Sequence, residues 1–345
     1  MTDIRIGAGF LGAISSVNDV EHLRRAARIC QDGGLASFWV ADQRWQRDVY
    51  VSLTDIAART DSLLLGTRVT DPYIRHPALT AVAIATLDEA SGGRAILGIG
   101  AGGSGFRQLG LARTKPAVAV RESIEVIRRL WSGEEFEFEG RIINWKRGAL
   151  EFKCRPDIPV VIAARGPFLL ELAGEVADAA IVASGVSPGG VGWARQLIAK
   201  GEMRAGRPQG QTDLMHMTYI SIDEDPRVAR QTVKKALVGT VVGSHPTYDF
   251  LRANGLEIPS DLSAYLDSGG YDAPRIIELI PDSFVDKLAI AGTVEDCAIQ
   301  LQGLLDAGIQ HPLLAPIPLR DGGEIEILEQ FVSRIMPELK AVSGA

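Results

Sequence analysis

The chain is poor in the residues that build disulfide frameworks and metal centres. It has three cysteines and five histidines among 345 residues. No two cysteines form a C-x-x-C pair and no two histidines have the spacing of metal ligands, so we expect neither a disulfide scaffold nor a metal site. Nothing in the sequence resembles a serine or cysteine triad, and no carboxylate pair indicates glycoside hydrolysis.

Long apolar runs are also missing. No stretch is long enough to cross a bilayer. The first ten residues lack a basic region followed by a long apolar run, so we expect no signal peptide and a reduced, cytoplasmic protein. The net charge of −7 argues against nucleic acid as a main partner, because phosphate binding needs a basic surface. Keeping the protein in solution is the simpler explanation of that charge.

What the sequence does contain is a regular alternation of short apolar runs with amphipathic segments. Eight strands are predicted: Ile4–Phe10, Ser37–Val40, Leu63–Val69, Arg94–Ile99, Pro159–Ala164, Ala179–Ser184, Leu214–Ile222 and His311–Pro316. Helices are predicted at Asn18–Asp32, Val49–Arg59, Pro77–Ala90, Pro116–Trp131, Pro167–Ala177 and Glu324–Lys340. Two more are predicted with one bound each: a helix after strand six that ends at about Ala205, and a helix after strand seven that begins at Pro226. Repeated strand–helix units predict a closed parallel (βα)8 TIM barrel, forming a single domain over residues 1–345. A doubly wound open sheet would need a topological switch and fewer strands.

Two segments do not fit the repeat. Residues 134–158 contain FEFEGRIINW and ALEFK, whose alternation of apolar and polar residues predicts a hairpin insertion before strand five. Residues 241–287 are too long for a plain connection, so we expect a largely helical insertion after strand seven. Because that insertion follows a strand, it should lie near the C-terminal face of the barrel. A lid over the substrate and a structural or subunit-contact insert are both open interpretations.

Barrel enzymes place their sites in the loops that follow the strands. After strand two, Asp42, Gln43 and Trp45 bring together a carboxylate, an amide and an indole, and we assign them catalytic roles. The alternative is a loop end in which Asp42 caps the next helix or pairs with Arg44. His76 precedes a helix-initiating proline, and we interpret it as structural.

Two glycine-containing loops could hold a ligand. Gly100, Gly102 and Gly103 follow strand four and would let the backbone approach a flat ligand, although their spacing is not that of a dinucleotide fingerprint. Gly166 opens a helix, and amides at a helix start suit an anion such as a phosphate. Ser184 lies on the neighbouring loop, so a phosphate between strands five and six is one interpretation and an ordinary tight turn is the other.

At these loops the sequence resembles the bacterial luciferase-like family of flavin and deazaflavin enzymes. It is most similar to the branch of F420-dependent methylenetetrahydromethanopterin reductases. The resemblance runs in order over roughly residues 4 to 185 and is specific as a set. It is carried by DVYVSLTDIA (Asp48–Ala57), GTRVTDPYIRHPALTA (Gly66–Ala81), TLDEASGGRAILGIGAGG (Thr86–Gly103), ALEFK (Ala149–Lys153) and AARGPFLLELAGEVAD (Ala163–Asp178).

The resemblance implies that a deazaflavin or flavin ring lies at the C-terminal end of the barrel. The ring would rest against a non-prolyl cis peptide in a bulge of strand three, whose counterpart here is Arg68–Val69. The phosphate-bearing tail would run towards the loops after strands five and six. A homodimer through helices of the N-terminal half is also implied. The implied cofactor-binding residues are Gly9, Asp42, Arg68, Val69, Thr70, Gly100, Gly102, Gly103, Ala164, Arg165, Gly166, Pro167, Ser184 and Gly185.

The sequence departs from the family pattern at several polar positions. The reductase branch carries acids where this chain has Gly9 and Gly103, and coenzyme-binding relatives often carry histidine where it has Gln43. These changes argue against a pterin substrate and leave no obvious proton donor. Arg68 replaces a small residue, and its positive charge would favour an anionic reduced cofactor or an acidic substrate.

Three functions follow from the resemblance. The first is hydride transfer between F420 and a small organic substrate. The second is a two-component monooxygenase that receives FMNH2, the reduced form of FMN, from a separate reductase and reacts it with oxygen. The third is a flavin-binding barrel without turnover. In each, aromatic residues are expected to shape the pocket: Trp45, Tyr248, Phe250, Tyr265 and Tyr271.

Overall fold

The barrel is closed and parallel. The structure, a computed structural model, describes residues 4–10, 19–43, 45–103, 106 and 108–343. Within these ranges eight strands pair in the order β1-β2-β3-β4-β7-β8-β9-β11, and β11 pairs back to β1. The strands are β1 (Gly7–Gly9), β2 (Ser37–Val40), β3 (Leu64–Thr67), β4 (Ala95–Ile99), β7 (Val160–Ala164), β8 (Ala179–Val182), β9 (Asp213–Ile222) and β11 (His311–Pro316). The predicted (βα)8 barrel is confirmed, with β1, β3 and β8 shorter than expected.

Helices surround the barrel, and several of them begin at a proline. Proline stands at the first position of α3, α4, α5, α6 and α7, where a missing amide costs nothing. The helices that follow barrel strands are α1 (Val20–Asp32), α2 (Val49–Ala57), α3 (Pro77–Ala90), α4 (Pro116–Trp131), α5 (Pro167–Val176), α6 (Pro188–Arg204), α7 (Pro226–Ser244), α13 (Glu324–Gln330) and α14 (Met336–Ser343). A π-helical turn at Phe331–Ile335 interrupts the expected final helix. No helix within the described ranges is long and apolar enough to cross a membrane.

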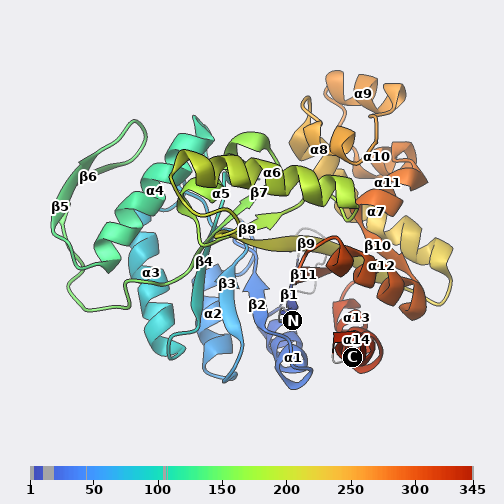
Figure 1. The fold of residues 1–345 in the computed structure, drawn as a ribbon, viewed down its shortest axis with the longest axis horizontal. Helices are drawn as coiled ribbons and strands as arrows, with labels where there is room; N and C mark the ends of the chain where they lie inside the picture. Colours follow the sequence, from blue (N-terminus) through green and yellow to red (C-terminus); the bar gives the residue numbers. More distant parts are fainter. Residues whose placement is uncertain (1–3, 11–18, 44, 104–105, 107, 344–345) are drawn as a thin grey trace.

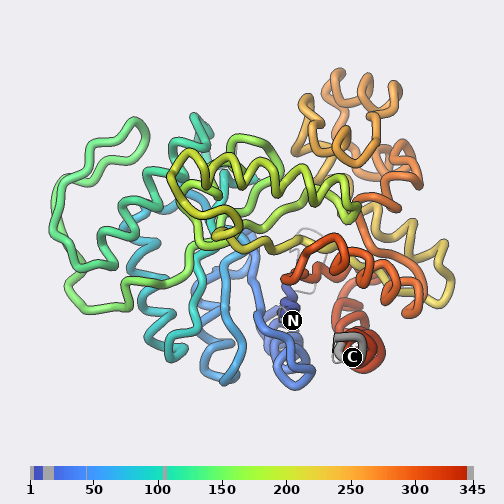
Figure 2. The backbone as a smooth tube through the Cα atoms, viewed as in Figure 1, coloured from blue at the N-terminus to red at the C-terminus, as the bar shows by residue number. Residues whose placement is uncertain are grey.

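The two insertions extend from opposite ends of the molecule (Figure 1). The hairpin β5–β6 projects beside α3 and α4, whereas α8, α9 and α10 stand above α7 at the other end. The backbone tube in Figure 2 shows the first and last helices lying together, and α1 contacts α13. The ring of helices is therefore closed by elements from the two ends of the chain.

The interior of the barrel is filled by apolar side chains around one large indole that packs against glycines. Trp39 on β2 is fully buried, and its indole nitrogen donates a 2.8 Å hydrogen bond to the Ser37 hydroxyl. A Cβ on Gly66 would lie 2.2 Å from the Trp39 ring, and a Cβ on Gly98 would lie 1.9 Å from the Thr67 carbonyl oxygen. Glycine at both positions is what lets the strands close around this indole. The result is a packed apolar core inside the barrel.

Strand three leaves the sheet in a bulge just after Gly66. Gly66 pairs with Ile96, and the next bridge joins Thr70 to Ile99, so the third strand carries one extra residue. The Thr67 hydroxyl bonds both backbone groups of Gly98, at 2.7 and 2.9 Å, and replaces the missing ladder contacts. The Arg68–Val69 peptide in this bulge is cis, as the family resemblance implies.

The expected hairpin is present as β5 (Phe136–Glu139) and β6 (Asn144–Gly148), which pair antiparallel. Glu122 of α4 anchors its turn, because its carboxylate accepts hydrogen bonds from the amides of Arg141, Ile142 and Ile143. These three backbone donors keep the pKa of Glu122 below its usual value although burial acts in the opposite direction.

The second insertion is a small helical unit with its own core. It comprises α8 (Asp249–Ala253), α9 (Ser260–Asp267), α10 (Ala273–Leu279) and α11 (Asp282–Leu288). Phe250, Leu262, Ile276 and Phe284 are buried together in a cluster that also includes residues of α7 and β9. The insertion is therefore held to the barrel through α7.

One strand and one helix were not predicted. β10 (Ile290–Gly292) pairs with the end of β9, where Ile220 lies opposite Ile290 on one side and opposite Pro316 on the other. β8 pairs with the first residues of β9, and β10 pairs with the last residues of β9 along the same edge. A three-residue strand carries too little periodicity to be predicted. The helix that follows, α12 (Val294–Asp306), begins with a capping box of Thr293 and Asp296, which is a signal readable in the sequence.

Candidate functional site

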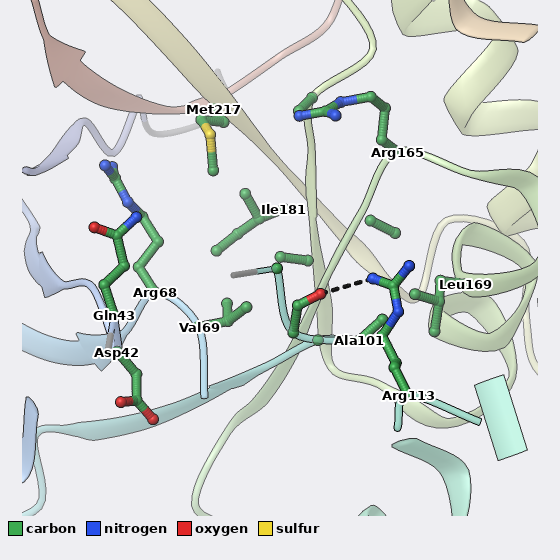
Figure 3. Close-up of a pocket in the computed structure, with 16 residues that line it drawn as sticks. Asp42, Gln43, Arg68, Val69, Ala101, Arg113, Arg165, Leu169, Ile181 and Met217 are labelled. Carbon is green, nitrogen blue, oxygen red and sulfur yellow. Dashed lines mark hydrogen bonds between the residues drawn. The ribbon is translucent and has the colours of Figure 1, made fainter. Parts of the chain in front are cut away.

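A cavity of about 320 Å³ opens where the barrel strands end. It falls within the range of roughly 300–1,000 Å³ that is usual for small-molecule sites. Its walls come from the loops after β2, β3, β4, β7 and β8 and from β9 (Figure 3). The lining residues are Asp42, Gln43, Arg68, Val69, Gly100, Ala101, Gly102, Gly103, Arg113, Ala163, Ala164, Arg165, Leu169, Ile181, Ala183 and Met217.

The floor of the cavity is apolar. Ala163 of β7, Ile181 of β8 and Met217 of β9 line it from strands that are neighbours in the barrel. All three belong to or pack against the interior cluster that contains Trp39. A flat apolar ligand would therefore rest directly on the packed core of the barrel.

One wall is made of backbone. A Cβ on Gly100 would lie 2.8 Å from a methyl group of Val69, so glycine allows the loop after β4 to close on the cis-peptide bulge. Gly102 has a φ of +72°, which favours glycine, and a Cβ there would meet the Phe106 ring at 2.4 Å. At Gly103 a Cβ would find no atom within 4 Å. Gly100 and Gly102 are thus required by geometry, whereas Gly103 borders open space.

Three arginines and one aspartate are the charged residues among the lining residues. Arg113 is exposed and donates a 2.9 Å hydrogen bond to the carbonyl of Gly102 (Figure 3). Arg165 donates to the carbonyl of Thr240 at 3.1 Å and to the hydroxyl of Ser244 at 3.2 Å, which ties the cavity to α7. The excess of positive charge suits an anionic ligand.

Arg68 is the deepest of the three arginines. Its side chain is 5% exposed, and burial lowers its pKa to about 10, so it stays protonated at neutral pH. Asp42 and Gln43 lie on the same side of the cavity (Figure 3). Burial raises the pKa of Tyr50 behind this wall, and the charge of Asp42 raises it further. This side of the cavity therefore combines a buried cation with a carboxylate and an amide.

Nine of the predicted site residues meet in the cavity, and seven do not line it. Trp45 is 69% exposed, and Thr70 is buried with its hydroxyl 3.3 Å from that of Tyr50. The backbone of Gly9 packs on Trp39, where a Cβ would lie 2.4 Å from a carbonyl oxygen. Gly166 and Pro167 begin α5 beside the cavity without contributing to its lining.

The loop after β8 is closed by the helical insertion. Asn254 donates a 2.6 Å hydrogen bond to the carbonyl of Ser184, and a Cβ on Gly185 would lie 2.5 Å from the Asn254 amide oxygen. The Nε2 of His216 lies 3.0 Å from the carbonyl of Gly185 and can only donate to it. The predicted phosphate contacts at Ser184 and Gly185 therefore lie in a covered turn.

The expectation that aromatic residues of the insertion line the pocket is wrong for this cavity. Tyr248 and Phe250 are buried in the core of the insertion, and Tyr271 is exposed. The Tyr265 hydroxyl accepts a hydrogen bond from the amide of Asp272 within the insertion. Their spacing in the sequence gave no indication of which face of each short helix is buried.

Sequence reasoning missed Arg113 and the apolar floor. The predicted loop after strand four stopped at Gly103, whereas the chain reaches its next helix only at Pro116, and Arg113 lies between them. Following the loop to the helix start would have found it. The floor residues gave no signal, because a strand buried on both faces has no polar side to identify its inward residues.

The cavity is suited to binding a flat, negatively charged ligand on an apolar floor. A planar ring fits between that floor and the backbone wall, and the arginines fit an anionic tail. No group of histidine, cysteine, aspartate and glutamate side chains able to hold a metal ion occurs in the part of the chain that the structure describes.

Comparisons with known proteins point in the same direction. A family model described as luciferase-like monooxygenase matches residues 5–311. A 5,10-methylenetetrahydromethanopterin reductase of Archaeoglobus fulgidus is 32% identical over 95% of this chain and 99% of its own length. The reductase of the same name from Methanolobus tindarius is 34% identical over 82% of this chain and 86% of its own. The solved structure of the coenzyme F420-dependent tetrahydromethanopterin reductase from Methanopyrus kandleri matches with a TM-score of 0.82 and 28% identity, over 98% of this chain and 99% of that one.

Proposed function

The chain belongs to the luciferase-like monooxygenase family, and on that premise we propose that it is an oxidoreductase that uses F420 to transfer hydride to or from a small organic substrate. The observation that carries the proposal is the match, over nearly the whole of both chains, to a solved F420-dependent reductase. The reductases from Archaeoglobus and Methanolobus support the same assignment.

The residues of the cavity fit this cofactor. Val69 and the loop of Gly100 would hold the deazaflavin ring on the floor formed by Ile181 and Met217. Arg113 and Arg165 would bind its negatively charged tail. When bound, F420 supplies the hydride chemistry, and the protein supplies orientation and electrostatics. The apolar floor would keep water from the side of the ring that rests on it, which suits hydride transfer.

The substrate proposed here is not a pterin of the kind named for the relatives. The family resemblance implies an acid at the position of Gly9, and in this chain that position has no space for a side chain because of the nearby carbonyl of Trp39. Gly103, the second position, borders open space, so an acid there would fit but is absent. A different small organic molecule is therefore the proposed substrate.

Binding of the two candidate cofactors tests the proposal directly. Titration of the cofactor-free protein with F420 and with FMN, followed by cofactor fluorescence, is expected to show tight binding of F420 and weak binding of FMN. Gly102→Val should reduce F420 affinity, because its side chain would crowd the backbone wall against which the ring is proposed to lie. Tight binding of FMN or FMNH2 without F420 would contradict the proposal and would indicate a two-component monooxygenase that needs a separate reductase.

We also propose that the protein is a homodimer through α2 and α3. Leu79 and Val82 lie three residues apart on α3 and are both exposed, and Val51 of α2 is 71% exposed. Beside them an apolar groove runs between α3 and the hairpin. Exposed apolar residues gathered in this way are typical of an interface. Light scattering at micromolar concentration should give twice the chain mass, and Leu79→Asp should give the chain mass; a monomeric parent protein would contradict this.

A further inference from the structure

Arg68 is buried without a partner. Its Nε, Nη1 and Nη2 atoms are all inaccessible to solvent, and none has a hydrogen-bond partner among the residues that the structure describes. Arg113 and Arg165, in the same cavity, each donate to backbone carbonyls. An arginine carries five N–H donors, so burying a guanidinium with none of them satisfied is costly. A ligand that supplied the acceptors would remove this cost.

The surroundings of Arg68 offer no substitute inside the protein. Burial lowers the pKa of Arg68, and the interaction with Tyr219 raises it. No carboxylate contributes to the shift. The Tyr219 hydroxyl already lies 3.2 Å from that of Thr240. The amide of Arg68 donates to the carbonyl of Val40 at 2.8 Å, so the backbone from which the side chain rises is fixed. The guanidinium is therefore enclosed without an acceptor from the residues that the structure describes.

The position of Arg68 separates it from the arginines assigned to the cofactor tail. In Figure 3, Arg68 and Gln43 occupy one side of the cavity, whereas Arg113 and Leu169 occupy the other. Gln43 adds a neutral amide, which can donate to an anion or accept from a neighbouring hydroxyl. This side of the cavity also holds the Asp42 carboxylate, which does not affect the pKa of Arg68. The cation and the amide are therefore available to the polar end of a second molecule.

The chemistry of that end follows from the guanidinium. Its planar fork binds a carboxylate through two parallel hydrogen bonds, and burial makes such a pair stronger than at the surface. We propose that Arg68 binds a carboxylate group of the substrate, so that this enzyme acts on a small organic acid. This rests on the proposed F420-dependent function, because it concerns the second molecule in the same cavity.

The test uses simple carboxylates as probes. The protein with F420 bound is titrated with acetate, succinate and benzoate at constant ionic strength, and with acetamide and benzamide as uncharged controls. The thermal midpoint and the F420 fluorescence report binding. Carboxylates are expected to raise the midpoint, and the amides are not. Arg68→Met should weaken the carboxylate response at least tenfold, whereas Arg227→Met, at an exposed arginine of α7 outside the cavity, should keep it.

A second readout distinguishes a binding role from a structural one. Because Arg68 has no partner, Arg68→Met should leave the midpoint of the probe-free protein unchanged or raise it. Arg68→Lys keeps the charge without the fork and should retain a weaker carboxylate response. If Arg68→Met destabilises the probe-free protein, the comparison of Arg68→Lys with the parent protein still tests the proposal.

Several results would overturn the inference. An unchanged carboxylate response in Arg68→Met would place the anion elsewhere. Loss of F420 affinity in Arg68→Met, with no carboxylate response in the parent protein, would show that Arg68 binds the cofactor's own negative charge. If the protein fails to bind F420 but still shows a carboxylate response that depends on Arg68, the carboxylate site would stand and the proposed F420-dependent function would be wrong.

Discussion

Two arginines at opposite ends of the barrel have opposite surroundings. Arg94 precedes β4, at the end where the strands begin, and its guanidinium donates to the carbonyls of Ala57, Thr60, Leu63 and Ser91 at 2.7–3.0 Å. Arg68 follows β3, at the end where the strands finish, and within the described ranges none of its side-chain nitrogens has a hydrogen-bond partner. The contrast teaches that the first end is completed by the protein itself, whereas the second leaves donors for a ligand.

The same contrast applies to glycine, and here the largest effect is expected. Gly98→Ala places a Cβ 1.9 Å from the Thr67 carbonyl oxygen, so strands three and four cannot keep their spacing. The expected loss is about 4 kcal/mol or more in the free energy of unfolding, or no folded protein. Gly103→Ala, whose Cβ would meet nothing within 4 Å, is the control and should unfold like the parent protein in denaturant titration.

The next effect concerns the two arginines directly. Arg94→Met leaves four part-buried carbonyl groups without their charged donor, and we expect a loss of about 3 kcal/mol. Urea unfolding monitored by circular dichroism measures it. Arg68→Met removes a charge without a partner and should cost nothing in the same assay. Equal losses in the two variants would remove the distinction between the two ends of the barrel.

The closed loop after β8 should respond to acid. His216 is fully buried, and desolvation lowers its pKa from 6.5 to about 4 in the folded protein, so unfolding at acidic pH takes up a proton. Stability from this group is complete above pH 6.5 and is lost as pH falls towards 4, by about 3 kcal/mol in all. The parent protein should lose stability over that window more steeply than His216→Gln. Parallel pH profiles of the two proteins would contradict this.

The smallest effect on stability is expected at the start of α5. Gly166 has an extended backbone, and a Cβ there would meet nothing within 4 Å, so Gly166→Asp fits and can cap the helix. Stability should rise by a few tenths of a kcal/mol, whereas F420 affinity should fall about tenfold through repulsion of the anionic tail. Gly166→Asn is the uncharged control. Unchanged affinity in Gly166→Asp would move the tail to another loop.

The sequence determined most of what depends on local signals. The bounds of α3 and α4 were predicted to the residue, because proline marks each start and Ser-Gly follows each end. The loops after β2, β3, β4 and β7 were identified from their positions after apolar strands, and nine of their residues line the cavity. The resemblance to a known family indicated the cis peptide at Arg68, which no local pattern in the sequence could reveal.

The tertiary structure decided what depends on distant residues. The turn at Ser184 is closed by Asn254, seventy positions along the chain, and Tyr248 and Phe250 are turned into a core of their own. Whether a charged side chain finds a partner is likewise settled only by packing, as Arg68 and Arg94 show. The physical reason is that capping and alternation act within a few residues, whereas burial and hydrogen-bond partners depend on segments that meet only when the barrel closes.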